Sequence, residues 1–158
     1  MRKNIEIRKL EKSIIRIREI FYREYANLYL LTGGKKNLLI DTGLGVFNIR
    51  KIVEKISSAP LVVLNTHCHY DHCGGNKFFG NIHIHQLEEQ CILHPNKQNT
   101  ASFLLNGKDF TYKPRGFNAS NYKVIPSNKA IPLKHNKIID LGNFKLQERR
   151  GIPKIHDF

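Results

Sequence analysis

The sequence predicts an α/β fold on three observations. Isoleucine alternates with charged residues in parts of residues 5–20, a period of two that indicates half-buried strands. Apolar residues recur at helical spacing over residues 45–58, with charged residues on the opposite side. The short apolar run 61–64 follows directly and reads as a strand covered on both faces. The order strand, helix, strand predicts a crossover connection in a layered architecture.

The other elements follow from turn residues and local periodicity. Further strands are expected at residues 27–31, 37–40 and 81–85, and helical segments at 76–79 and 86–93. Gly33-Gly34 lies between the first two of these strands and predicts a β-hairpin. Residues 95–130 are polar and poorly periodic, so we interpret them as a long surface insertion. Residues 138–146 predict a second hairpin, with its turn at Gly142-Asn143.

Length and composition indicate one globular domain. The chain has 158 residues, 41% of them hydrophobic, and no apolar run approaches the roughly 18 residues of a membrane span. The amino-terminal residues mix charge with isoleucine and do not form a secretory signal. Three cysteines without such a signal fit a reducing compartment, so we expect a cytoplasmic protein without structural disulfides.

The net charge of +13 raises the alternative of a protein that binds nucleic acid or an anionic surface. The basic excess is divided between the two flanks, residues 1–50 and residues 97–158, and no basic stripe is interleaved with aromatic residues. This distribution favours a lysine-rich solvated surface. Nucleic acid is therefore an unlikely partner on the sequence alone.

The segment Thr66-His67-Cys68-His69-Tyr70-Asp71-His72-Cys73-Gly74-Gly75 carries the chemistry. His67 and His69 are two residues apart, so in extended backbone they point to one face, and Asp71 and His72 follow where the chain turns. Imidazole and carboxylate groups are ligands for zinc, manganese or iron. Gly74-Gly75 would let the loop pass close to the metal and start a new element without a Cβ clash. Cys68 alternates away from the two histidines and is expected to pack rather than to ligate.

A divalent metal at this cluster would lower the pKa of bound water to about 7 and so supply hydroxide at neutral pH. Two ions about 3.5–4 Å apart could share that hydroxide. Asp71 is the candidate catalytic residue, because its carboxylate can orient the water or accept its proton.

The motif at residues 66–75, preceded by Ile40-Asp41-Thr42-Gly43 at the end of an earlier strand, resembles the metallo-β-lactamase superfamily. Asn27-Leu28-Tyr29-Leu30 and Ile139-Asp140-Leu141-Gly142 are similar to its thioesterase and glyoxalase II-like branch. The resemblance implies the amino-terminal half of an αββα sandwich, a mixed sheet with flanking helices. It also implies a metal-dependent hydrolase that acts on a small-molecule thioester or ester, with no membrane partner.

The resemblance also assigns roles to particular residues. His67 and His69 match ligands of a first metal, Asp71 and His72 match ligands of a second, and Asp41 matches a buried residue that supports the metal loop. The expected cofactor is one or two Zn²⁺ ions, with iron or manganese as alternatives.

The sequence departs from the family pattern beyond residue 147. Family members continue there into a segment with a further histidine ligand, whereas residues 148–158 do not match. We therefore expect a partial domain over residues 1–147 and a non-matching tail over 148–158, from a truncated or frameshifted reading frame. A separately encoded carboxy-terminal half, or a homo-oligomer, would complete the site. The alternative is a catalytically inactive fragment that retains metal binding.

Overall fold

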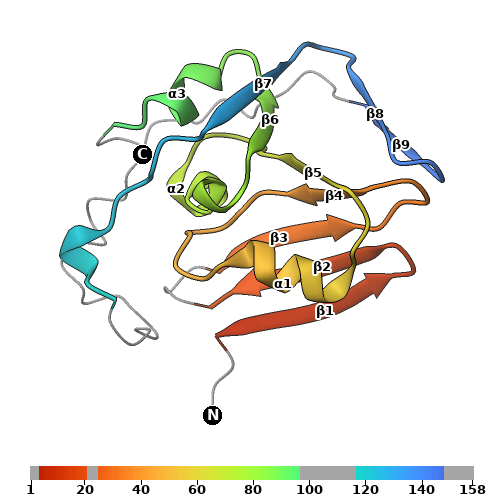
Figure 1. Ribbon diagram of the computed structural model, residues 1–158, viewed down its shortest axis with the longest axis horizontal. Coiled ribbons are helices and arrows are strands. Elements are labelled where there is room, and N and C mark those ends of the chain that lie inside the picture. Colours follow the sequence, from red (N-terminus) through yellow and green to blue (C-terminus); the bar gives the residue numbers. More distant parts are fainter. Residues whose placement is uncertain (1–3, 21–24, 97–116, 148–158) are drawn as a thin grey trace.

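The computed structural model describes residues 4–20, 25–96 and 117–147 (Figure 1). Seven strands form one sheet in the order β1 to β7, and two further strands form a separate hairpin. The strands are β1 (Ile5–Glu11), β2 (Ile14–Glu19), β3 (Ala26–Leu31), β4 (Asn37–Ile40), β5 (Leu61–Leu64), β6 (Asn81–His85), β7 (Lys129–Leu133), β8 (Ile138–Asp140) and β9 (Lys145–Gln147). The helices are α1 (Ile49–Ile56), α2 (Tyr70–Cys73) and α3 (Glu89–Leu93), with 3₁₀ turns η1 (Asn76–Phe78) and η3 (Ala119–Asn121).

The sheet is mixed, as the sequence predicted. Strands β1 to β4 pair antiparallel with their neighbours, whereas β4 to β7 pair parallel. The change occurs at β4 because short connections can join only antiparallel neighbours, and the α1 crossover returns the chain to lay β5 parallel to β4. The predicted hairpins at residues 27–40 and 138–146 are both confirmed.

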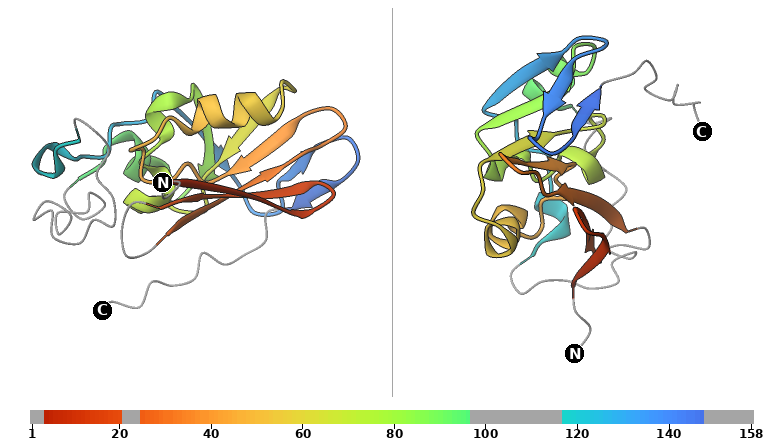
Figure 2. Two further views of the ribbon diagram at one scale, coloured as in Figure 1. Left: turned by 90° about the horizontal axis from the view of Figure 1, so that it is seen from below. Right: turned by 90° about the vertical axis from the view of Figure 1, so that its right-hand side faces the viewer.

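Alternation along the strands divides the core between the two faces of the sheet. Leu39 on β4 and Val63 on β5 pack in the larger cluster together with α1, whereas Leu38 and Val62 belong to a second cluster with the β8–β9 hairpin. Figure 2 shows α1 and this hairpin on opposite sides of the sheet. Both faces of the central strands are therefore covered, which explains why residues 61–64 are apolar throughout.

Helix α1 is shorter than the amphipathic pattern indicated. It begins after Asn48, whose side chain accepts a hydrogen bond from the Lys51 backbone N–H, and ends at Ile56. Ile49 and Val53 are its buried residues. The preceding residues 45–47 form a loop, because the backbone there turns around a buried carboxylate described below.

Strand β7 was not predicted. Residues 95–130 were interpreted as a surface insertion, but Lys129–Leu133 pairs parallel with β6 along five residues. Pro132 obscured the strand in the sequence, and it is tolerated because β7 lies at the edge of the sheet. Residues 97–116 of the expected insertion, and the tail 148–158, lie outside the described residues. Within the described part of the chain, no helix has both the length and the apolar character needed to cross a bilayer.

Candidate metal centre

The histidine loop lies at the carboxyl ends of β4 and β5, where α/β sheets commonly place their sites. Asp41 follows β4, and Thr66 to His69 lead from the end of β5 into the single turn of α2. Strand β5 therefore fixes the start of the segment that carries the candidate ligands, β4 places Asp41 beside it, and the turn of α2 presents Asp71 and His72.

The structure brings the three candidate histidines together. The ring centroids of His67 and His69 are 4.6 Å apart, and those of His67 and His72 are 4.0 Å apart. The fourth candidate, Asp71, has its Oδ2 3.2 Å from His72 Nε2. Extended backbone at His69 and the turn that follows produce this convergence.

Asp41 anchors the loop from β4. Its carboxylate accepts hydrogen bonds from the Thr66 backbone N–H at 2.8 Å and from the Thr66 hydroxyl at 2.9 Å. His72 Nδ1 lies 2.8 Å from Asp41 Oδ2, which leaves Nε2 of the same ring toward Asp71. Asp41 is 4% exposed and does not join the ring cluster directly. It occupies the place of an outer carboxylate that orients a ligating histidine.

A buried polar network holds the backbone of the loop, and sequence reasoning missed it. The His72 carbonyl accepts hydrogen bonds from the Thr42 backbone N–H at 2.8 Å and from Asn65 Nδ2 at 2.9 Å. Asn76 donates through Nδ2 to Asn65 Oδ1 at 2.8 Å and to Ser127 Oγ at 2.9 Å. Ser127 comes from beyond residue 120, so no local pattern could have indicated this contact.

Gly74 and Gly75 pass against the backbone that follows β4. A Cβ on Gly75 would meet the Thr42 carbonyl oxygen, and one on Gly74 would meet the Leu44 carbonyl oxygen. Gly43 and Gly45 have φ of 76° and 74°, in the left-handed region that favours glycine. Gly74 and Gly75 were predicted to allow close approach to a metal, and the close approach that the structure shows is to the backbone of Thr42 and Leu44.

Glu19 lies beneath the same turn and was also missed. Its carboxylate is fully buried and accepts hydrogen bonds from the backbone N–H groups of Leu44 at 2.6 Å and Phe47 at 3.2 Å. Burial raises its pKa to about 7, although these hydrogen bonds act in the opposite direction. A signal was present in the sequence: Glu19 continues the inward-facing alternation of Ile15 and Ile17, which places a carboxylate on the core face of β2.

Burial and neighbouring charges separate the protonation states of the cluster. Burial, with the nearby His72 and His69, lowers the pKa of His67 to about 4. Burial also opposes the charged form of His72, but hydrogen bonds to Asp41 and Asp71 outweigh it and raise that pKa to about 10. Burial raises the pKa of Asp71, and its contact with His72 lowers it to a greater extent. At neutral pH, His67 therefore offers an unprotonated nitrogen and Asp71 a carboxylate.

The expectation that the chain has no disulfide is wrong. Cys68 Sγ is bonded to Cys91 Sγ on α3, with the Cα atoms 6.0 Å apart. Tertiary structure decides this pairing, because residues 81–93 fold back so that α3 lies against the histidine loop. The argument from cysteine number to a reducing compartment thereby loses its basis. The expected alternation holds, since the Cys68 side chain lies toward α3 rather than among the imidazoles.

The donor chemistry of the cluster fits a divalent metal. Three imidazoles and a carboxylate are suitable ligands, and His72 has the outer carboxylate partner that metal-binding histidines usually have. Within residues 4–20, 25–96 and 117–147, the one set of three potential ligand atoms that lie within 4.8 Å of one another is Cys68, Glu88 and Cys91. The four candidate ligands of the histidine loop therefore do not bring three donor atoms this close together in the described structure, and the His67 ring lies nearer to the His72 ring than to the His69 ring.

The chain is similar to curated proteins along nearly its whole length. It is 26% identical to the human acyl-coenzyme A thioesterase MBLAC2 over 95% of this chain and 61% of that protein. It is 29% identical to the chicken protein of the same name, over 94% of this chain and 60% of that protein. A probable metallo-hydrolase of Bacillus subtilis, YqgX, is 29% identical over 56% of this chain and 44% of its own length. The chain thus spans about three fifths of the length of the first two relatives.

Solved structures share the fold at low sequence identity. MEM-A1, a subclass B3 metallo-beta-lactamase from a soil metagenome library, superposes with a TM-score of 0.62 at 15% identity over 91% of this chain and 52% of its own. A metallo-beta-lactamase from Pontibacter korlensis gives 0.60 at 15% identity, over 90% and 59%. The described sheet therefore corresponds to an α/β half of the metallo-beta-lactamase fold. A profile of the metallo-beta-lactamase superfamily matches residues 22–134, and the chain belongs to that superfamily.

Proposed function

We propose that this chain supplies a metal-binding half of a hydrolase site that acts on a thioester or a related ester. The observation that carries the proposal is the convergence of His67, His69, Asp71 and His72 at the ends of two buried strands, on a loop anchored by Asp41. The thioester is proposed because curated relatives are named acyl-coenzyme A thioesterases. Superfamily membership supports hydrolysis more generally.

Each residue has a defined part in this proposal. His67 and His69 would hold one divalent ion, and Asp71 and His72 a second, with zinc as the first expectation and iron or manganese as alternatives. Such an ion supplies hydroxide at neutral pH by lowering the pKa of bound water to about 7. Asp41 would hold the Nδ1 proton of His72, and a bound ion would displace the proton on Nε2, so that Nε2 becomes the ligating nitrogen. Asp71, ionised at neutral pH, is the group that would hold the proton given up by the attacking water.

The proposal includes further ligands from outside the described residues. Each ion would have two protein ligands from this chain, whereas catalytic zinc normally has three. We propose that residues 1–147 act as one partial domain, apart from the tail 148–158. A separately encoded segment, or a second copy of the chain, would supply the remaining ligands. Because catalytic zinc normally has three protein ligands, these residues alone are expected to show little or no thioester turnover.

Metal retention tests the site directly. The full chain is incubated separately with zinc, iron and manganese, desalted, and analysed for bound metal by elemental analysis. We expect His67→Ala and His69→Ala each to lower the retained metal. His135→Ala, at an exposed histidine between β7 and β8, serves as the matched control and should retain the wild-type amount. Unchanged metal in both loop variants would remove the assignment.

Turnover is tested separately with an acyl-coenzyme A thioester. The chain by itself should be nearly inactive, and robust chelator-sensitive hydrolysis would contradict the need for further ligands. Retained metal without turnover under every condition, including addition of the carboxy-terminal part of a longer relative, would favour the inactive-fragment alternative.

A further inference from the structure

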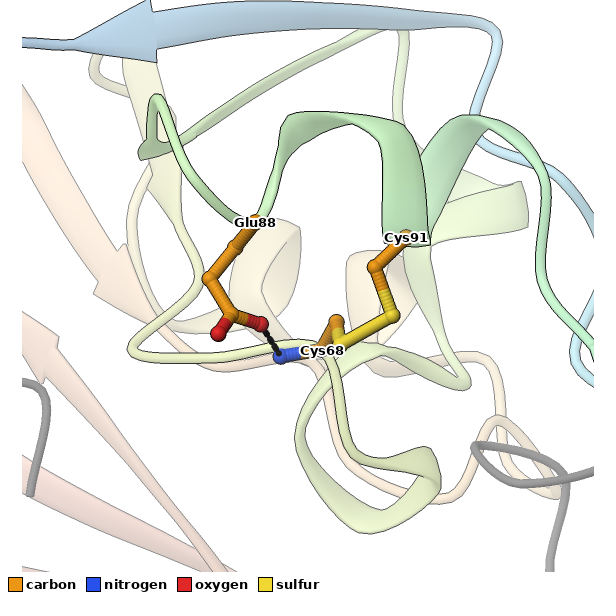
Figure 3. Close-up of side chains that lie close together, drawn as sticks. All are labelled: Cys68, Glu88 and Cys91. Carbon is orange, nitrogen blue, oxygen red and sulfur yellow. Dashed lines mark hydrogen bonds between the residues drawn. A yellow bond between two sulfur atoms is a disulfide. The ribbon is translucent and has the colours of Figure 1, made fainter. Parts of the chain in front are cut away.

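A second cluster of donor groups lies on the α3 side of the histidine loop. Cys68, Glu88 and Cys91 place a sulfur, a carboxylate oxygen and a second sulfur within 4.8 Å of one another, and all three residues are partly buried (Figure 3). This cluster is chemically unlike the histidine cluster, because two of its three donors are soft sulfur atoms. The two sulfurs are joined as a disulfide.

Noncovalent contacts hold these groups together in addition to the disulfide. Glu88 accepts a hydrogen bond from the Cys68 backbone N–H at 3.0 Å, which uses one of its two carboxylate oxygens. Glu88 is the residue that precedes α3, and Cys91 is three residues later, so both lie on one face of the turn. Backbone hydrogen bonds attach both ends of this segment to the β7 region, Gln86 N to Leu133 O at 3.0 Å and Ser127 N to Ile92 O at 2.9 Å. Reduction would therefore leave two thiols and a carboxylate facing one another.

We propose that Cys68, Glu88 and Cys91 form a sulfur-rich metal site that is separate from the histidine cluster. This site is available only when the disulfide is reduced. Two thiolates and one carboxylate are three protein ligands of a tetrahedral site, and water would take the fourth position. The ligand softness selects zinc or another thiophilic ion over magnesium or calcium. With Zn–S bonds of about 2.3 Å, the two sulfurs must lie about 3.8 Å apart. Rotation about the Cα–Cβ bonds provides that separation, because the two Cα atoms are 6.0 Å apart.

Metal and disulfide exclude each other because they use the same sulfur atoms. When the reduced pair binds a divalent ion, two thiol protons leave to solvent. Oxidation by a low-molecular-weight disulfide then proceeds by thiol–disulfide exchange. One cysteine thiolate attacks the oxidant and releases one small thiol; the other cysteine displaces the second. The protein loses two electrons, the oxidant gains them and takes two protons from solvent to become two small thiols, and the ion is released. A dithiol reductant reverses the exchange.

Cobalt is the probe for this site, because sulfur ligation gives a sulfur-to-metal charge-transfer band that histidine and carboxylate ligands lack. The full chain is reduced, freed of reductant under anaerobic conditions and titrated with Co²⁺. Reduced protein should show three free thiols and the band at one ion per chain, whereas the oxidised protein should show one thiol, that of Cys73, and no band. Oxidised glutathione added to the cobalt form should abolish the band as two thiols disappear.

Three variants separate this site from the proposed hydrolase site. Cys91→Ser should lose the band at equal protein folding, judged by circular dichroism. Glu88→Gln should keep the band and bind cobalt at least about 10-fold more weakly. His67→Ala should keep the band unchanged while losing metal from the histidine cluster. Failure of the sulfur site can therefore be told apart from failure of the proposed hydrolase site. A reduced wild type with three counted thiols and no charge-transfer band would overturn the proposal, as would a band that survives oxidation or Cys91→Ser.

Discussion

The histidine loop is held from two sides by different chemistry. On the β4 side, Asp41, Thr42 and Asn65 bind it through buried hydrogen bonds to Thr66 and His72. On the α3 side, Cys68 is held at three atoms. Its backbone N–H donates to Glu88, its carbonyl accepts from the Cys73 thiol at 3.1 Å, and its sulfur is bonded to Cys91.

The two sides of the loop depend on solution conditions in different ways. The β4 side acts through the folded state, since its hydrogen bonds are strong only where burial excludes water. The α3 side acts largely through the unfolded chain, whose freedom the disulfide limits. The stability contributed by the β4 side should therefore change with substitution and pH, and that contributed by the α3 side should change with redox conditions.

Reduction of the disulfide should have the largest effect on stability. The bond closes a loop with a sequence separation of 23, which corresponds to about 3.5 kcal/mol in the chain-entropy treatment. The free energy of unfolding, from urea titrations with and without a phosphine reductant, should fall by about that amount. Cys91→Ser is the matched control, because reductant should change its stability no further. If the free energy of unfolding of the wild type does not change with reductant, the disulfide does not stabilise the α3 side of the loop.

Glu19 should give the β4 side a distinct pH dependence. Its pKa is about 7 in the folded chain and near 4.5 when unfolded, so the folded state holds the proton more tightly. Its contribution to stability is complete below pH 4.5 and is lost as pH rises through 7, a fall of about 3 kcal/mol. The stability of wild type minus that of Glu19→Gln should decline over this interval. A difference that is flat or rises with pH would show that Glu19 is not the group responsible.

Asp41→Asn should weaken the noncovalent anchor and the metal site together. Asparagine tolerates the φ of 63° found at this position, so the change isolates the loss of charge and of acceptor capacity. We expect the free energy of unfolding to fall by about 2 kcal/mol and zinc affinity to fall about 10- to 100-fold. Asp140→Asn, at an exposed carboxylate of the β8–β9 hairpin, should change neither measurement appreciably. Equal effects of the two substitutions would contradict an anchoring role for Asp41.

Gly75→Ala should test how closely the loop packs against the turn after β4. The added methyl meets the Thr42 carbonyl oxygen, so we expect a loss of about 2 kcal/mol in the free energy of unfolding. Gly80→Ala is the matched control, because a Cβ there meets nothing within 4 Å. Thermal or urea unfolding of the two variants gives the comparison. If Gly80→Ala proves the more destabilising, the described packing of the loop is incorrect.

The elements formed by local periodicity and turns could be predicted from the sequence. Apolar runs bounded by turn residues identified the strands at residues 27–31, 37–40 and 61–64, alternation identified those within residues 5–20, and the spacing of His67 and His69 predicted that they point to one face. The same kind of reasoning failed for Lys129–Leu133, where Pro132 hides a strand that only the existing edge of β6 makes stable. It also failed for Asn76 and Ser127, which meet because distant segments pack together.

The amino-acid sequence places three imidazoles, a carboxylate and two glycines in one short segment after a buried strand. The surroundings of these groups come from the packing of distant segments. This packing buried Glu19 beneath Leu44, attached His72 to Asp41, and brought Cys91 to Cys68 across a sequence separation of 23. The physical reason is that strand and turn formation depend on neighbouring residues. The pairing of buried polar groups and sulfur atoms depends instead on which surfaces the sheet order brings into contact.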